Sequence, residues 1–114
     1  MKMNHLVFIF LALASYHNYA FTTINNDAPP KKFIVVLDAG HGGHDSGNRG
    51  NGFYEKDIVL DVTLQVGKLL EKHPDIKVVY TRKTDVFIDL YRRGPIANEV
   101  DADIFVSIHC DSHN

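Results

Sequence analysis

Three short apolar runs, each the length of a β-strand, most constrain the fold that this chain can adopt. Residues 33–37 read Phe-Ile-Val-Val-Leu, residues 76–81 read Ile-Lys-Val-Val-Tyr-Thr, and residues 103–109 read Asp-Ile-Phe-Val-Ser-Ile-His. All three are predicted to be strands, and the continuous apolar, β-branched run over residues 33–37 is typical of a strand that is buried on both faces. Because the intervening segments are long enough for helices, the pattern predicts an α/β fold: a mostly parallel, twisted sheet with helices on both faces.

Two helices are expected between these strands. The first, over about 54–72, has apolar residues at a spacing of three to four and ends before Pro74. Its apolar positions are Ile58, Val59, Val62, Val66, Leu69 and Leu70. The second helix, over about 89–100, contains Pro95, which removes a backbone hydrogen bond and clashes with the preceding turn. We therefore expect the second helix to be kinked or to start late.

The sequence stops at Asn114, five residues after His109 and without a helix to cover the third strand. About 80 ordered residues make only a thin core for a sheet of this kind. We therefore expect the sheet to be truncated after the third strand, and residues 33–114 to form the N-terminal part of a longer domain.

The first twenty residues have the pattern of a secretory signal peptide. Lys2 precedes an uncharged apolar run over residues 6–14, and small residues follow it. The run is too short to cross a bilayer as a helix, which needs about 20 residues. Cleavage is expected after Ala20, with Ala14 as the alternative site, and a buried N-terminal strand or helix is the competing interpretation of residues 1–20. Residues 21–32 form a polar linker.

The composition is that of a globular domain, with 45% hydrophobic and 23% charged residues. Twelve basic and fourteen acidic residues leave a formal net charge of -2, which gives no electrostatic reason to expect nucleic acid or an anionic membrane as a partner. No transmembrane segment is expected in the mature chain, and the predicted location is the periplasm or the extracellular cell envelope. The lone cysteine, Cys110, excludes an internal disulfide.

Three residues far apart in the sequence are expected to meet at one edge of the sheet. His41 follows the first strand, Glu55 opens the first helix, and His109 ends the third strand. In open parallel sheets, ligands bind beyond the carboxyl ends of the strands, where these three residues fall. Two imidazoles and one carboxylate are a common ligand set for a catalytic zinc ion that keeps water in the fourth position. The sequence thus predicts a metal site on His41, Glu55 and His109.

Other interpretations remain open for each residue by itself. The glycine-rich loop around His41 is also compatible with a solvated loop or with a phosphate-binding turn before a helix. It lacks the Lys-Ser/Thr ending of a P-loop, however, and does not fit the dinucleotide-binding pattern. Glu55 alone is a common type of acid at a helix start. His109 is harder to explain without a partner, because it is a polar residue that ends an apolar strand.

The remaining polar residues are assigned structural roles. His44, His73 and His113 are expected at the surface, with His44 and His113 as alternative cleft residues. Cys110 is expected to face away from the His109 side and to act as a small buried thiol rather than as a nucleophile. A final set is expected to anchor loops by hydrogen bonds, with substrate contact as the alternative: Arg82, Arg93 and Asn98.

From residue 33 to residue 113, the sequence resembles the zinc-dependent N-acetylmuramoyl-L-alanine amidases that trim bacterial cell walls. Five ordered blocks carry the resemblance: residues 36–47 (Val-Leu-Asp-Ala-Gly-His-Gly-Gly-His-Asp-Ser-Gly), 55–57 (Glu-Lys-Asp), 80–85 (Tyr-Thr-Arg-Lys-Thr-Asp), Arg93 with 96–98 (Ile-Ala-Asn), and 102–109 (Ala-Asp-Ile-Phe-Val-Ser-Ile-His). The order and spread of the blocks make the resemblance much more specific than any single block.

The resemblance implies that residues 33–114 are the N-terminal part of an amidase catalytic domain. It implies Zn²⁺ on His41, Glu55 and His109, and peptidoglycan as the substrate, cleaved at the amide between N-acetylmuramic acid and L-alanine. Cell-wall remodelling or daughter-cell separation is the corresponding role. The family's general base is a glutamate on a later strand, expected beyond Asn114, so no catalytic residue is assigned within this chain. Asp45 and Asp111, the nearby carboxylates, are not assigned that role.

Two other functions compete with the amidase interpretation. One is an inactive or peptidoglycan-binding fragment that lacks the C-terminal general base. The other is a non-haem iron enzyme, because two histidines and one carboxylate also bind iron. The strand-helix alternation argues against the second, since that iron ligand set usually lies on a β-barrel.

Overall fold

The computed structural model describes residues 30–110. The predicted signal peptide, most of the predicted linker and residues 111–114, which include His113 and Asp111, lie outside the described residues. Residues 30–32, the end of the predicted linker, contain no helix or strand. Within the described part, no helix is long and apolar enough to cross a membrane.

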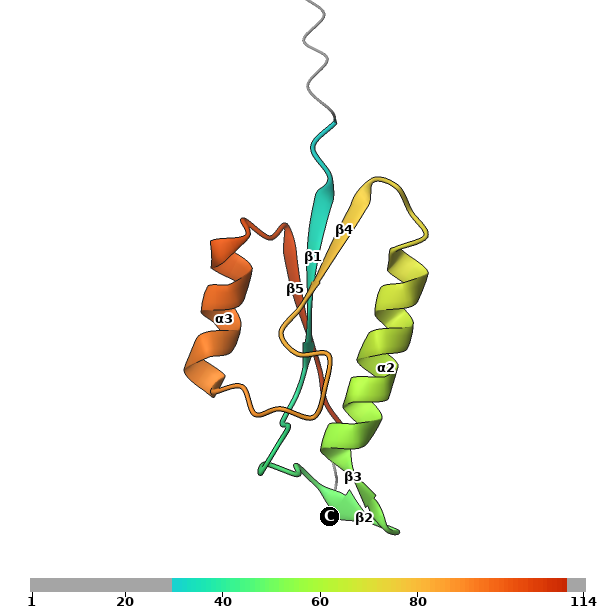
Figure 1. Cartoon of the computed structure of the whole chain (residues 1–114), viewed down its shortest axis with the longest axis vertical. Coiled ribbons are helices and arrows are strands. Elements are labelled where there is room, and N and C mark those ends of the chain that lie inside the picture. Colours follow the sequence, from blue (N-terminus) through green and yellow to red (C-terminus); the bar gives the residue numbers. More distant parts are fainter. Residues whose placement is uncertain (1–29, 111–114) are drawn as a thin grey trace, which may run out of the picture.

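The central layer is a parallel sheet of three strands in the order β4-β1-β5. Strand β1 (Phe33–Ala39) pairs in parallel with β4 (Ile76–Tyr80) on one side and with β5 (Ile104–Ile108) on the other. The strands lie between helices α2 (Glu55–Leu70) and α3 (Leu90–Glu99), as Figure 1 shows. The predicted α/β fold, with a parallel sheet and a helix on each face, is confirmed.

The core is built on the middle strand. Val35, Val36 and Leu37 of β1 are all buried, and Val59 of α2 joins them. Burial on both faces is thus confirmed for β1. Within residues 30–110, β5 pairs only with β1 and is one of the two edge strands of the sheet. Its residues Ile104 and Phe105 are consequently 45% and 40% exposed.

Helix α2 packs through a different face from the one that its apolar spacing predicts. Its buried positions are Glu55, Val59, Thr63 and Gly67. The side chains of Ile58, Val62 and Leu69, which the periodicity placed toward the core, are exposed. The physical reason is that small residues allow close approach: a Cβ atom at position 67 would collide with the Tyr80 hydroxyl. The polar Glu55 also faces inward, because it belongs to the site described below.

Helix α3 runs without interruption through Pro95. Asp89 caps it by accepting a hydrogen bond from the Tyr91 N–H at 2.8 Å, and the helix begins at Leu90. The expectation that it starts late is therefore wrong. Pro95 is exposed, while Arg93 and Ala97 are buried. Since successive residues are about 100° apart around a helix, the proline lies opposite this buried pair.

A small hairpin, which was not predicted, lies between the glycine-rich loop and α2. Strands β2 (Arg49–Gly50) and β3 (Phe53–Tyr54) pair in an antiparallel manner. Asn51 and Gly52 connect them with φ values of 52° and 84°. Asn-Gly is a strong signal for a two-residue hairpin turn, because both positions need positive φ. The Asn-Gly pair is therefore the sequence signal for a hairpin in this glycine-rich segment.

Candidate metal centre

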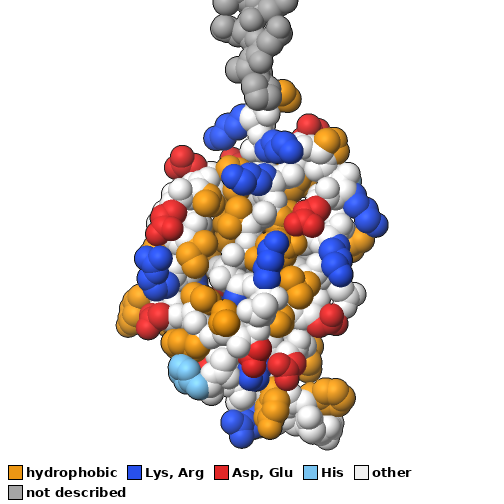
Figure 2. Space-filling view, in the orientation of Figure 1, with side chains coloured by type: hydrophobic (Ala, Val, Ile, Leu, Met, Phe, Trp, Pro, Cys, Tyr) orange, Lys and Arg blue, Asp and Glu red, His pale blue; other side chains and the backbone are white. Residues whose placement is uncertain are grey.

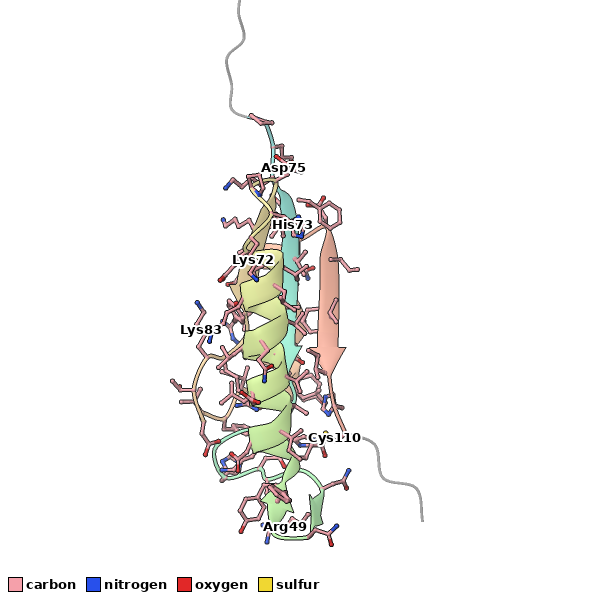
Figure 3. All side chains as sticks on the ribbon, turned by 90° about the vertical axis from the view of Figure 1, so that its right-hand side faces the viewer. Arg49, Lys72, His73, Asp75, Lys83 and Cys110 are labelled. Atoms are coloured by element: carbon pink, nitrogen blue, oxygen red, sulfur yellow. The ribbon has the colours of Figure 1, made fainter. Side chains whose placement is uncertain are left out.

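The carboxyl edge of the sheet brings together the three predicted ligands. Ala39 and Ile108, the last residues of β1 and β5, lie in register. His41 lies two residues after the end of β1, His109 directly follows β5, and Glu55 is the first residue of α2. Figure 3 shows Cys110 at the carboxyl end of β5, at the same end of the molecule as Arg49 of the hairpin. The predicted convergence is therefore present in the structure.

The three side chains point their ligand atoms at one another. Nε2 of His41 lies 3.1 Å from Oε1 of Glu55, and Nδ1 of His109 lies 3.2 Å from each of these atoms. A tetrahedral zinc ion with ligands at about 2.0–2.1 Å would place neighbouring ligand atoms about 3.3–3.4 Å apart. The donor atoms and their spacing therefore fit a divalent ion of this kind, and the three residues form a group able to hold a metal.

Backbone N–H groups hold the Glu55 carboxylate in place. The N–H of Asn48 donates to Oε2 at 2.9 Å, and the N–H of Cys110 donates to Oε1 at 2.8 Å. Burial by itself would raise the pKa of Glu55, but these two hydrogen bonds and the nearby rings of His41 and His109 outweigh it, so the pKa lies below the ordinary value. The carboxylate is consequently ionised at neutral pH, as a metal ligand must be.

His41 lies in a tight turn with an unusual backbone. Its φ is 58°, and Gly42 and Gly43 follow with φ values of 121° and 58°. Non-glycine residues rarely adopt positive φ, and such strain persists only where the surroundings impose it. Here the turn is closed by two hydrogen bonds between the backbones of Gly42 and Asp45, at 2.9 and 3.1 Å. In this turn, Nε2 of His41 faces Glu55 and His109.

Two buried arginines hold the backbone of the His41 loop. Arg82 donates to the carbonyl oxygens of Ala39 and Gly40 at 2.9 and 2.7 Å. Arg93 donates to the carbonyl oxygens of Ala39 and His41 at 2.8 and 2.9 Å. The two arginine residues are only 3% and 7% exposed, respectively. The interpretation that both arginines anchor loops is therefore correct for the described structure.

The polar residues to which the sequence assigns structural or surface roles do not belong to the cluster. His44 is exposed, and its ring packs against Phe87 with centroids 4.1 Å apart. His73 is exposed at the end of the molecule opposite the cluster (Figure 3). Asn98 is exposed on α3. Cys110, two residues after the end of β5, is half-buried rather than buried. It contributes to the site through its backbone N–H, which donates to Glu55.

Two aspartates contribute to the site in ways that the sequence did not reveal. Oδ2 of Asp45 lies 2.9 Å from Nδ1 of His41, on the side of the ring away from the cluster. Asp38 is buried beneath the loop and accepts hydrogen bonds from Thr81, Arg93 and Ser107. The signal available for Asp45 was its position four residues after a ligand in the same glycine-rich loop. The signal available for Asp38 was that it is a charged residue directly after the apolar run over residues 33–37.

Two hollows border the cluster. One, of about 490 Å³, includes His41 and His109 and is lined by apolar side chains that include Phe87 and Phe105. The other, of about 370 Å³, includes Glu55 and is lined by Arg49 and other residues of the hairpin. The cluster is thus open to molecules larger than water on two sides. Basic and acidic side chains are interspersed on the face that Figure 2 shows, in keeping with the low net charge.

The structure defines an α/β domain with three side chains placed to hold a metal ion, and comparison with known proteins identifies its family. Residues 35–114 match the model of the family described as N-acetylmuramoyl-L-alanine amidase. The chain therefore belongs to the N-acetylmuramoyl-L-alanine amidase family.

Similar proteins occur in phages and bacteria. The chain is 47% identical over 79 residues to the endolysin of Bacillus phage SPP1, a match that covers 69% of this chain and 29% of that protein. It is 45% identical over 96 residues to N-acetylmuramoyl-L-alanine amidase AmiA of Escherichia coli, covering 78% of this chain and 33% of that protein.

A solved structure shows the same fold. The catalytic domain of CwlV, an N-acetylmuramoyl-L-alanine amidase from Bacillus (Paenibacillus) polymyxa var. colistinus, superposes with a TM-score of 0.69 at 43% identity. The match covers 70% of this chain and 46% of that domain. The chain thus spans about a third or less of the two relatives above and just under half of this solved catalytic domain.

Proposed function

We propose that this chain is the metal-holding, N-terminal part of a zinc-dependent peptidoglycan amidase domain. The reaction would be hydrolysis of the amide between the lactyl group of N-acetylmuramic acid and L-alanine of the stem peptide. The observation that carries the proposal is the cluster of His41, Glu55 and His109, whose ligand atoms lie 3.1–3.2 Å apart in a chain of this family. The two hollows support it, because they leave room for substrate beside the cluster.

In this proposal, the residues of this chain bind the metal ion and orient it toward the substrate. His41 and His109 supply imidazole nitrogens, and Glu55 supplies one carboxylate oxygen. A bound Zn²⁺ ion would lower the pKa of a coordinated water to about 7 and polarise the scissile carbonyl. Arg82 and Arg93 would keep the His41 loop fixed while substrate binds, since they hold its carbonyl oxygens.

The general base is proposed to come from outside the described residues. Hydrolysis adds hydroxyl to the lactyl carbonyl carbon and a proton to the alanine nitrogen, so a base must first take a proton from water. Within residues 30–110, two other carboxylates line the hollow beside the cluster, and both are already engaged. Asp45 faces His41, and Asp38 accepts hydrogen bonds from Thr81, Arg93 and Ser107. A glutamate beyond Asn114 remains our proposal for this role.

The proposed location is the periplasm or the extracellular cell envelope, with residues 1–20 as the export signal. Peptidoglycan lies outside the cytoplasmic membrane, so an enzyme acting on it has to be exported. Pulse labelling of the expressed chain in a bacterial host tests this: the proposal expects a shortened product that begins at residue 21. A product that keeps residue 1 in the cytoplasm would contradict it.

The amidase proposal is tested on purified peptidoglycan. The chain of 114 residues is assayed beside a version extended to a full catalytic domain, with and without Zn²⁺. We expect the extended version to release new amino groups on L-alanine without new reducing sugar ends, and the shorter chain to bind the wall with little turnover. Release of reducing ends, or the absence of any new amino group with the extended version, would contradict the amidase proposal.

Metal analysis separates zinc from iron. Protein purified without added metal is expected to contain zinc as its main ion. Iron in stoichiometric amount would overturn the zinc proposal in favour of a non-haem iron site.

Gly47 is expected to control the geometry of the cluster. Its φ is 61°, and a Cβ atom at this position would lie 2.6 Å from Cδ2 of His41 and 2.7 Å from Oε2 of Glu55. We therefore expect Gly47→Ala to displace both ligand side chains and to weaken zinc binding. The positive φ adds a cost of about 1–2 kcal/mol to the free energy of folding. Chelator competition and thermal unfolding measure the two effects.

Gly52 provides the matched control for that variant. It also has a positive φ, of 84°, but a Cβ atom there would meet nothing within 4 Å. Gly52→Ala is expected to lower the melting temperature to a similar extent and to leave zinc affinity unchanged. Equal zinc affinities of the two variants would show that Gly47 does not shape the cluster.

A further inference from the structure

The side chain of His41 is held between two carboxylates, one on each ring nitrogen. Nε2 faces the cluster, 3.1 Å from Oε1 of Glu55, and Nδ1 faces Oδ2 of Asp45 at 2.9 Å. A neutral imidazole carries one proton, and only the nitrogen without it has a lone pair for a metal ion. The carboxylate that holds this proton therefore decides whether His41 is able to serve as a ligand through Nε2.

The surroundings of the two carboxylates favour the proton on the Asp45 side. Oε1 of Glu55 already accepts the N–H of Cys110 and also faces His109. Oδ2 of Asp45 has His41 as its one hydrogen-bond partner within residues 30–110. An ionised carboxylate only accepts hydrogen bonds, so a proton shared between Asp45 and His41 lies on Nδ1.

Asp45 is itself fixed within the loop that it supports. Its Oδ1 accepts the N–H of Gly47 at 3.0 Å, and its backbone exchanges two hydrogen bonds with Gly42. The carboxylate and the imidazole are thus held by the same turn, four residues apart. His109 has no equivalent support: its Nδ1 faces the cluster, and no hydrogen bond to its Nε2 is found in the described part of the chain.

We propose that Asp45 is a positioning residue for metal binding, which holds His41 as the Nδ1–H form and leaves Nε2 to bind the ion. Carboxylates that hold ligand histidines in this way raise the basicity of the ligand nitrogen and fix the plane of the ring. The inference rests on the proposed function to the extent that the cluster holds a divalent ion. It adds a residue that acts on the ion through His41 rather than as a ligand.

The test compares zinc affinity of the full chain, Asp45→Asn and Asp45→Ala by chelator competition. Removal of such a partner typically weakens metal binding by about 10–100-fold, and we expect a loss in this range for both variants. Thermal unfolding of the metal-free proteins shows whether a variant is folded.

Asp85→Asn is the matched control. Asp85 also holds the glycine-rich loop, because it accepts the N–H of Gly43 at 2.7 Å and pairs with Lys56. It loses the same charge on substitution, but it makes no contact with His41. Zinc affinities of Asp45→Asn and Asp85→Asn that are equally reduced would overturn the proposal, because the effect would then be one of loop anchoring.

A second measurement needs no variant. In the zinc-loaded chain labelled with ¹⁵N-histidine, the proposal expects His41 to bind through Nε2 and to show a proton on Nδ1 that exchanges slowly. Binding through Nδ1, with the proton on Nε2, would overturn it. Failure of the wild-type chain to bind zinc would contradict the proposed function instead, so the two ideas fail in different ways.

Discussion

His109→Ala is expected to abolish zinc retention, with the zinc content falling from about one ion per chain to background. His109 supplies one of three ligand atoms, and its Nδ1 lies 3.2 Å from both of the others. Two protein ligands are too few for a catalytic zinc site, which usually has three. In the extended enzyme, we expect the amidase rate to fall on the order of 1,000-fold or more, because the metal contributes several kcal/mol to catalysis. Metal analysis and the peptidoglycan assay measure the two losses.

Glu55→Gln also tests zinc retention, with a smaller change to the side chain. Glutamine keeps the shape of the side chain but removes the charge, and its amide NH₂ would meet the N–H of Asn48 or Cys110 at 2.9 or 2.8 Å. We expect weak zinc binding in a chain that still folds. His73→Ala is the control for both variants, since His73 is exposed at the far end of the molecule. Zinc retention near the wild-type level in His109→Ala would contradict the assignment of the cluster.

The cluster could be predicted because it depends on topology rather than on loop detail. Once residues 33–37 and 103–109 are recognised as parallel strands, their carboxyl ends must meet at one edge of the sheet. His41 and His109 follow those ends within two residues, so errors in the strand boundaries hardly move them. Glu55 could be placed for a similar reason, because a helix that returns across the sheet has to start at that edge.

The supports of the cluster could not be predicted, because they depend on the path of a loop. The contact of Asp45 with His41 requires a turn in which a non-glycine residue has a φ of 58°. Sequence spacing does not reveal such strain. Likewise, Arg82 and Arg93 were recognised as loop anchors, but the carbonyl oxygens that they hold follow from the three-dimensional path alone.

The packing face of α2 was mispredicted for a different reason. Apolar periodicity identifies a stripe, but it assumes that the largest apolar residues determine the buried side. In α2, close approach to Tyr80 at Gly67 and the inward position of Glu55 determine it instead. The helix is rotated so that Ile58 and Val62 are 41% exposed. The inward-facing Glu55 and the small Gly67 thus determine which face of α2 is buried, and the largest apolar side chains do not.

Asp38 is the residue whose loss is expected to affect folding most. The residue is almost fully buried, with 1% exposure, and each carboxylate oxygen is hydrogen-bonded. Oδ1 accepts from Thr81 at 2.6 Å and from Arg93 at 2.7 Å, and Oδ2 accepts from Ser107 at 2.7 Å. The network joins β1, α3 and β5 with the segment that follows β4. It also neutralises Arg93, which would otherwise be a buried charge without a partner.

Asp38→Ala is expected to destabilise the chain by about 3–5 kcal/mol, the usual cost of removing one partner of a buried ion pair. Since about 1 kcal/mol lowers the melting temperature of a domain this small by about 4–8 °C, the variant is expected to melt tens of degrees lower or to remain unfolded. Asp61→Ala is the control, because Asp61 is exposed on α2 and its side chain accepts from Gln65 alone among residues 30–110. Circular dichroism during heating measures both, and a similar melting temperature for both would contradict the prediction.

Acid unfolding tests the same network through Asp38→Asn, which keeps the shape of the side chain. Burial by itself would raise the pKa of Asp38, but hydrogen bonds from Thr81, Ser107 and Arg93, with the charge of Arg93, outweigh it, so the folded pKa lies below the ordinary value. The folded chain therefore binds this proton less readily than the unfolded chain, in which aspartate titrates near about 3.9. The contribution to stability is complete above that pH and is lost as the pH falls through the folded pKa. We expect the free energy of unfolding to decrease more steeply below about pH 4 in the wild type than in Asp38→Asn, whereas equal slopes would show that this carboxylate carries no linked stability.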